Sequence, residues 1–138
     1  MLRGMATVSY WADDLEAAKR WYADLLGIEP YFSVPGVGGK VGYYEFRVGD
    51  NQDELGLIDS RYRPETLSPG PGGTVMYWHV DDVHAAHERL VALGCTEIEP
   101  LKDRGEGFIT TAFLDPFGNV LGVMYNPHFV EMNATDER

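Results

Sequence analysis

The alternation of apolar and polar residues predicts the same succession of elements twice along the chain. In the first half, an alternating run over residues 5–12 predicts a strand. Apolar residues then recur every three or four positions from Leu15 to Leu26, which is typical of a helix that packs on a sheet, and Gly27 ends it. Three shorter extended runs complete a βαβββ order, and they cover residues 30–34, 41–48 and 54–59.

The second half repeats this order. The helix start Asp13-Asp14-Leu15 returns 68 residues later as Asp81-Asp82-Val83, and such self-similarity fixes the architecture before any other signal is read. The second copy of the pattern predicts a strand, a helix closed by Gly94 and three further strands, at residues 74–80, 82–93, 96–100, 107–114 and 119–125. We therefore predict one structural unit written twice.

Glycine and proline mark the boundaries between these parts. We expect a single domain over residues 1–138 that consists of a first module, a linker, a second module and a polar, frayed tail. Their ranges are 5–60, 61–73, 74–126 and 127–138.

Charge and cysteine content limit the partners and the cellular location that we expect. Twenty-two acidic against eleven basic side chains give a net charge of −11, which disfavours nucleic acid and anionic membranes as partners. The single cysteine, Cys95, allows no disulfide within the chain, and no basic-then-apolar leader follows Met1. No apolar run approaches the ~20 residues of a membrane span. We expect a cytoplasmic protein.

Two βαβββ units in one short chain resemble the vicinal oxygen chelate superfamily, the group of glyoxalase I, extradiol dioxygenases, fosfomycin resistance proteins and the bleomycin resistance protein. The resemblance spans residues 5–126 and includes Leu25-Leu26-Gly27, Ala92-Leu93-Gly94 and Asp115-Pro116-Phe117-Gly118-Asn119. It implies an α+β fold in which each module curls its mixed sheet into a half-barrel, with helices outside and a ligand in the concave cup. Fold similarity alone assigns no reaction.

The resemblance also implies where a metal would bind. Metal enzymes of this superfamily carry ligands on the first and last strands of each module, at positions that correspond here to Thr7, Gly56, Val75 and Gly122. None of these is an effective ligand, and a catalytic divalent site normally takes about three protein ligands. We therefore expect no metal and no cofactor.

Histidine leaves a metal alternative open. His79 with Glu45 or Glu54 could hold a metal away from the usual place, although a histidine beside Asp81 is more simply a hydrogen-bonded residue of the rim. His84 and His87 have a spacing that can bind metal, but they lie on a helix face rich in charged residues. No catalytic residue is identified.

Strand alternation predicts which side chains line the cup, because alternate residues share one face of a sheet. The ligand-binding residues that we expect are Thr7, Ser9, Trp11, Tyr43, Glu45, Arg47, Glu54, Tyr77, His79, Thr111, Phe113 and Met124. An apolar concavity with a few polar groups is the usual form of a small-molecule site.

We interpret the protein as a metal-independent binding protein that sequesters a small aromatic or amphipathic ligand. The acidic charge suits a cationic ligand, and the resemblance to the bleomycin resistance type implies a homodimer. Two alternatives stay open. One is a glyoxalase-like lyase, isomerase or dioxygenase with an altered metal site, and the other is a dimeric interaction module whose cup is filled by side chains. The sequence leaves open whether the modules pair within one chain or between two.

Overall fold

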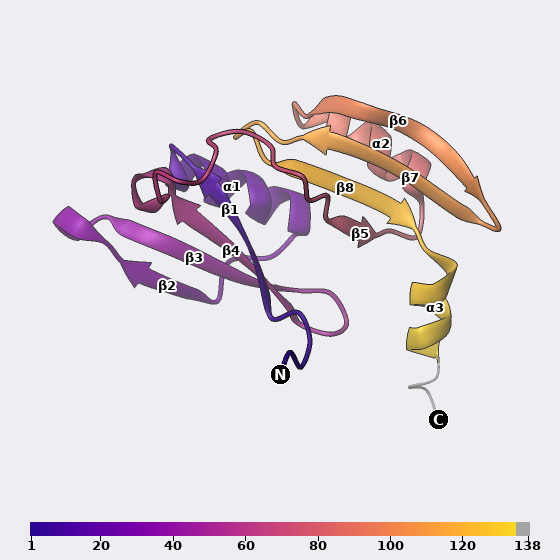
Figure 1. The fold of residues 1–138 in the computed structure, drawn as a ribbon, viewed down its shortest axis with the longest axis horizontal. Coiled ribbons are helices and arrows are strands. Elements are labelled where there is room, and N and C mark those ends of the chain that lie inside the picture. The colour runs from indigo at the N-terminus through magenta and orange to yellow at the C-terminus, as the bar shows by residue number, and fades with distance from the viewer. Residues whose placement is uncertain (135–138) are drawn as a thin grey trace. The chain divides into compact units, whose positions relative to one another are not determined.

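The computed structural model describes residues 1–134, and the chain divides between Ser68 and Pro69 into two compact units. Each unit holds one four-stranded mixed sheet with a helix on one of its faces (Figure 1). The predicted α+β class and the two βαβββ modules are confirmed. No helix among the described residues combines the length and the apolar character that a membrane crossing needs.

In the first unit the strands lie in the order β1-β4-β3-β2. Strand β1 runs parallel to β4, and the other pairs are antiparallel. The elements are β1 (Thr7–Ala12), α1 (Leu15–Leu26), β2 (Phe32–Pro35), β3 (Val41–Val48) and β4 (Asp53–Asp59). Short 3₁₀ turns follow β2 at Val37–Gly39 and β4 at Ser60–Tyr62.

The second unit has the corresponding order, β5-β8-β7-β6, again with one parallel pair, β5 with β8. Its elements are β5 (Tyr77–His79), α2 (Val83–Ala92), β6 (Thr96–Gly105), β7 (Phe108–Leu114), β8 (Val120–Tyr125) and α3 (Pro127–Ala134). Strand β5 is shorter than predicted, and β6 is longer and interrupted by irregular pairing around Pro100.

Each long helix begins in the same way in both units. The carboxylate of Asp14 accepts a hydrogen bond from the backbone N–H of Ala17 at 3.0 Å, and Asp82 accepts one from Ala85 at the same distance. These side chains satisfy amide groups that have no partner within the helix. The repeated aspartates are therefore helix caps.

Each helix buries one face of its sheet. In the first unit, alternate residues of the strands pack against α1 and form the core, which includes Tyr10, Leu55, Leu57, Tyr44 and Phe46. The other face of this sheet carries the remaining alternate residues. We call it the first open face, and it presents Thr7, Ser9, Trp11, Phe32, Val34, Tyr43, Glu45, Arg47, Glu54, Gly56 and Ile58.

The chain after β8 differs from the sequence prediction. Residues 127–134 form helix α3, whereas the sequence predicted a polar, frayed tail over 127–138. The side chain of Asn126 accepts hydrogen bonds from the backbone N–H groups of His128 and Phe129, which caps the start of this helix. The last four residues of the predicted tail lie outside the described part of the chain.

Candidate functional site

The first open face carries an apolar row. Register places Trp11 beside Ile58, Ile58 beside Tyr43, and Tyr43 beside Val34, so one residue of each strand contributes. A polar row lies four residues away along each of three strands, where Thr7 pairs with Glu54 and Glu54 with Arg47. The face is therefore amphipathic along the strand direction.

Glu45 lies between these rows and is the most buried acid of the face, with only 8% of its surface exposed. Tyr43 donates a hydrogen bond to its Oε1 at 2.6 Å, and Tyr31 donates to its Oε2. Burial raises the pKa of this carboxyl, the charge of Glu54 adds to the effect, and Arg47 opposes it.

The other charged groups of this face have partners as well. The hydroxyl of Thr7 donates to Glu54 at 2.7 Å, and the guanidinium of Arg47 lies 4.4 Å from the centre of the Tyr31 ring. A cation over an aromatic face is attracted by the ring quadrupole. Arg47 is thus directed onto Tyr31, and Glu45 and Glu54 remain as two neighbouring carboxylates.

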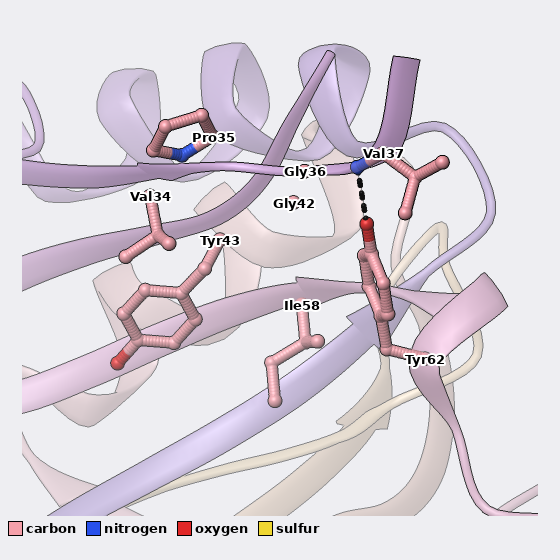
Figure 2. A pocket seen from close by; sticks show the side chains of 8 residues that line it. All are labelled: Val34, Pro35, Gly36, Val37, Gly42, Tyr43, Ile58 and Tyr62. Carbon is pink, nitrogen blue, oxygen red and sulfur yellow. Dashed lines mark hydrogen bonds between the residues drawn. The ribbon is translucent and has the colours of Figure 1, made fainter. Parts of the chain in front are cut away.

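A cavity of about 530 Å³ adjoins the apolar row. Figure 2 shows Ile58 between the rings of Tyr43 and Tyr62, with the β2–β3 connection on the opposite side. Its lining is mainly apolar and consists of Val34, Pro35, Gly36, Val37, Gly42, Tyr43, Ile58 and Tyr62. Ligand pockets commonly have this volume and lining.

Two glycines make room for Tyr62 in the cavity wall. A Cβ atom at Gly36 would lie 2.5 Å from the Tyr62 hydroxyl, and one at Gly42 would lie 2.8 Å from its ring. The hydroxyl accepts a hydrogen bond from the backbone N–H of Val37 at 2.9 Å (Figure 2). Because the phenol accepts in that bond, its own proton is available to a ligand.

The positions that correspond to metal ligands do not fit a metal ion. A Cβ at Gly56 would lie 2.6 Å from the Tyr43 hydroxyl, and one at Gly122 would lie 2.7 Å from Cδ1 of Tyr77, so tyrosine side chains fill both places. Thr7 is bonded to Glu54. Within residues 1–134, no three His, Cys, Asp or Glu side chains gather closely enough to hold a metal.

The open face of the second sheet repeats the tyrosine–glutamate pair. Tyr77 covers Gly122 and donates to Glu99 at 3.0 Å, and Glu99 is in turn paired with Arg104. Burial raises the pKa of Tyr77, and the hydrogen bond to Glu99 raises it further. The hydroxyl is therefore a protonated donor at neutral pH.

His79 has partners at both ring nitrogens. Its Nδ1 accepts a hydrogen bond from the backbone N–H of Asn126 at 3.1 Å, so the ring hydrogen lies on Nε2, which is 3.3 Å from a carboxylate oxygen of Asp81. The ring also stacks on Phe129 at 4.5 Å. His79 thus lies in the network that the rim interpretation describes. Of the helical histidines, His84 is exposed, and His87 contacts Glu97 and Phe113.

Ten of the predicted site residues lie on open faces, and two do not. Thr7, Ser9, Trp11, Tyr43, Glu45, Arg47 and Glu54 lie on the first open face, and Tyr77, His79 and Met124 lie on that of the second sheet. Ligand contact by these residues stays a prediction.

The placement of Thr111 and Phe113 in a cup was wrong. The β7–β8 hairpin pairs Thr111 with Val123 and Phe113 with Leu121, which sets both on the side of the sheet that packs against α2. Both are fully buried, and the Thr111 hydroxyl donates to the backbone carbonyl of Glu99 at 2.9 Å. Ala112, between them, is the residue that faces the same side as Gly122.

Sequence reasoning missed Tyr31, Val34 and Tyr62. Val34 lies on a four-residue strand, too short for a clear alternation, and Tyr31 precedes that strand. Tyr62 lies in a 3₁₀ turn that the sequence assigned to the linker. The only sequence signal for Tyr62 was the pair Gly36 and Gly42, whose missing side chains leave space for its ring.

Several solved structures share the fold of this chain. A member of the glyoxalase/bleomycin resistance protein/dioxygenase superfamily from Sphaerobacter thermophilus DSM 20745 is 21% identical, with a TM-score of 0.72 over 91% of this chain and 98% of that chain. A glyoxalase-related enzyme from Fulvimarina pelagi is 22% identical, with a TM-score of 0.69 over 91% and 90% of the two chains.

The fosfomycin resistance protein FosX from Listeria monocytogenes is 15% identical, with a TM-score of 0.68 over 91% of this chain and 95% of that chain. These identities show a shared fold only.

No curated protein matches the sequence. The protein-family model for the Glyoxalase/Bleomycin resistance protein/Dioxygenase superfamily matches residues 4–123 of this chain. The chain therefore belongs to this superfamily.

Proposed function

We propose that the protein binds a small aromatic or amphipathic molecule on the first open face without a metal and sequesters it. The observation that carries this proposal is the juxtaposition of the apolar row and its cavity with the two carboxylates of Glu45 and Glu54. A flat apolar group would lie against Trp11, Ile58 and Tyr43. A polar group on the same molecule would then extend toward Glu45.

A cationic polar group suits this site better than an anionic one. Glu45 and Glu54 carry two negative charges when ionised, and Arg47 supplies one positive charge that is directed onto Tyr31. A ligand ammonium group beside these carboxylates would gain charge-assisted hydrogen bonds. It would also favour the ionised form of Glu45, which burial disfavours.

Metal independence is supported by the side chains at the four corresponding positions. Tyr43 and Tyr77 fill the space at Gly56 and Gly122, and Thr7 and Val75 are weak or unsuitable ligands. Elemental analysis of the purified protein tests this directly. About one zinc, nickel or iron per chain would restore the lyase, isomerase or dioxygenase alternative.

The second candidate function is a dimeric interaction module, and the exposed edge of the first sheet favours it. Strand β2 lies at that edge, and Phe32 and Val34 are 48% and 40% exposed. Such side chains on an edge strand can contact another chain. Homodimer formation is part of both proposals, and a cytoplasmic location stays a prediction from the cysteine content.

Ligand titration separates the two functions. Tryptophan fluorescence would follow binding of 1-naphthylmethylammonium and of 1-naphthylacetate, which carry similar aromatic groups and opposite charges. We expect the cation to bind more tightly than the anion. Glu54→Gln should weaken binding of the cation by about 3- to 10-fold, because an ion pair in a partly buried site contributes ~1 kcal/mol.

Glu88→Gln is the matched control, because it removes the same charge from an exposed position on α2. Equal weakening by both variants would show a general charge effect and contradict the proposed site. Absence of binding by either compound, together with a dimer in analytical ultracentrifugation, would favour the interaction module.

A further inference from the structure

Helix α3 covers one end of the open face of the second sheet. It follows β8 directly (Figure 1), and two of its residues contact side chains of that face. Phe129 stacks on His79 with 4.5 Å between ring centres and 16° between planes, and His128 meets Phe108 edge to face at 4.9 Å. We propose that α3 is a displaceable cover of a second aromatic-binding site.

The internal repeat shows what α3 replaces. Ile58 of β4 corresponds to Met124 of β8, 66 positions on, and the same offset relates Tyr62 to His128. In the first unit, the chain after Ile58 forms a single 3₁₀ turn and leaves the cavity of Figure 2 open. In the second unit, the chain after Met124 forms α3, and Phe129 lies on the face instead.

The cover buries little of its own surface. Helix α3 has eight residues, none of them buried, and Val130 and Met132 are among its exposed apolar side chains. Helices of this length are not stable by themselves in water. Elements with little buried apolar surface open at low free-energy cost, while the core of the same protein stays folded.

Displacement of α3 would expose a site of defined chemistry. The His79 ring would lose its stacking partner, and a displacement that includes the capping residue Asn126 would also remove the hydrogen bond from the Asn126 N–H to Nδ1 of His79. Met124 lies beside His79 on the same face and adds a polarisable thioether. A ligand that replaces both contacts is a planar aromatic molecule with an N–H or O–H donor next to the ring.

The test compares the intact chain with two variants that weaken the cover. Phe129→Ala removes the stacked ring, and a chain that ends at Tyr125 removes α3 and the Asn126 donor. The probe is N-phenyl-1-naphthylamine, which is neutral, carries an N–H group and fluoresces when it leaves water. Both variants are expected to gain one probe site per chain. We expect the variants to bind the probe at that site about tenfold more tightly than the intact chain does. In the intact chain the site is open only part of the time, and the apparent affinity is reduced by that fraction.

Two controls make the test specific. Val130→Ala changes an exposed side chain of the same helix and should leave probe binding unchanged. The N-methylated probe lacks the donor and should gain less than the parent compound in the truncated chain.

Three results would overturn the proposal. One is no gain in either variant, and another is an equal gain in Val130→Ala. The third is a truncation that lowers the melting temperature as much as Phe113→Ala, since α3 would then belong to the fold and not be a cover. Any probe binding at the first open face is the same in all of these variants. Failure of the proposed function at that face would therefore not change the difference between the intact chain and the α3 variants.

Discussion

The ring of Tyr77 covers Gly122 so closely that a Cβ atom at residue 122 would lie 2.7 Å from Cδ1 of the tyrosine. The same added atom would also lie 2.9 Å from the backbone carbonyl oxygen of Met76. The absence of a side chain at Gly122 thus leaves the space that the Tyr77 ring occupies. Tyr43 has the same relationship to Gly56 in the first unit.

This relationship predicts that Gly122→Ala destabilises the protein. Overpacking in a well-packed region costs about 1–3 kcal/mol, and one of the two atoms in the way belongs to the backbone and cannot rotate aside. Gly56→Ala is the comparison, because only side-chain atoms of Tyr43 and Ser9 lie in its way. Urea denaturation should give a larger loss for Gly122→Ala. Equal stability of Gly122→Ala and the unmodified chain would show that Tyr77 moves freely.

Metal removal should leave the protein unchanged. We expect no change of melting temperature in excess chelator, because tyrosine side chains fill the positions of two ligands. A metal present at 100 times its dissociation constant would add about 2.7 kcal/mol, which thermal unfolding detects easily. Restoring ligands with Thr7→His, Gly56→Glu, Val75→His and Gly122→Glu should also fail to create tight zinc binding. Stoichiometric zinc binding by this variant would show that Tyr43 and Tyr77 can move away from the ligand positions.

Glu45 should make stability depend on pH in a defined direction. Burial raises its folded-state pKa above the ordinary value of 4.5, so the folded protein holds this proton more tightly than the unfolded chain does. The free energy of unfolding therefore falls as pH rises from 4.5 through the folded-state pKa. At higher pH the folded protein carries the full cost of the buried charge.

Glu45→Gln removes this titration. The melting temperature of the variant relative to the unmodified protein should therefore rise between pH 4 and pH 8, and Glu88→Gln controls for the change in net charge. The amide also changes the hydrogen bonds with Tyr31 and Tyr43, and this change shifts the melting temperature by a similar amount at every pH. A difference that decreases with rising pH would contradict the assigned direction.

Cys95 should react slowly with alkylating reagents. Burial raises the pKa of its thiol to about 11, and the charge of Asp115 adds to this. The thiolate is the reactive species, so at pH 8 about one thiol in a thousand is ionised. Iodoacetamide should modify the folded protein far more slowly than the urea-unfolded chain, as followed by mass spectrometry. Equal rates would show that the thiol is accessible and activated.

The sequence predicted the fold more fully than the site. The aspartates at both helix starts, the glycines after both helices and the strand alternation are local signals, and the internal repeat shows each of them twice. Alternation also predicted correctly that Thr7, Ser9 and Trp11 share a face. The position of Phe113 depended on the register of a hairpin, where a shift of one residue exchanges the two faces.

Other parts of the site depend on contacts between distant segments. Tyr62 lines the cavity only because the chain after β4 turns back over Gly36 and Gly42. Helix α3 was predicted as part of a polar, frayed tail, although Phe129, Val130 and Met132 are apolar, and the helix contacts the sheet through Phe129 on His79. Neither contact has a local pattern that a single sequence reveals.

Trp11 is the residue whose truncation tests the proposed ligand site most directly. It lies on the first open face beside Ile58, so Trp11→Ala should weaken binding of 1-naphthylmethylammonium by about 2- to 30-fold, because aromatic and cation–π contacts contribute ~0.5–2 kcal/mol. Binding would be followed by isothermal titration calorimetry, since the substitution removes a fluorescent group.

Trp21→Ala is the matched control, because Trp21 lies on α1 against Tyr22 and is absent from the open face. We expect this control to retain the affinity of the unmodified protein. A tryptophan that only filled the core would behave differently, since its truncation costs roughly 3–5 kcal/mol of stability. Loss of that size in Trp11→Ala, with unchanged affinity in the folded fraction, would place Trp11 in the core and remove it from the ligand site.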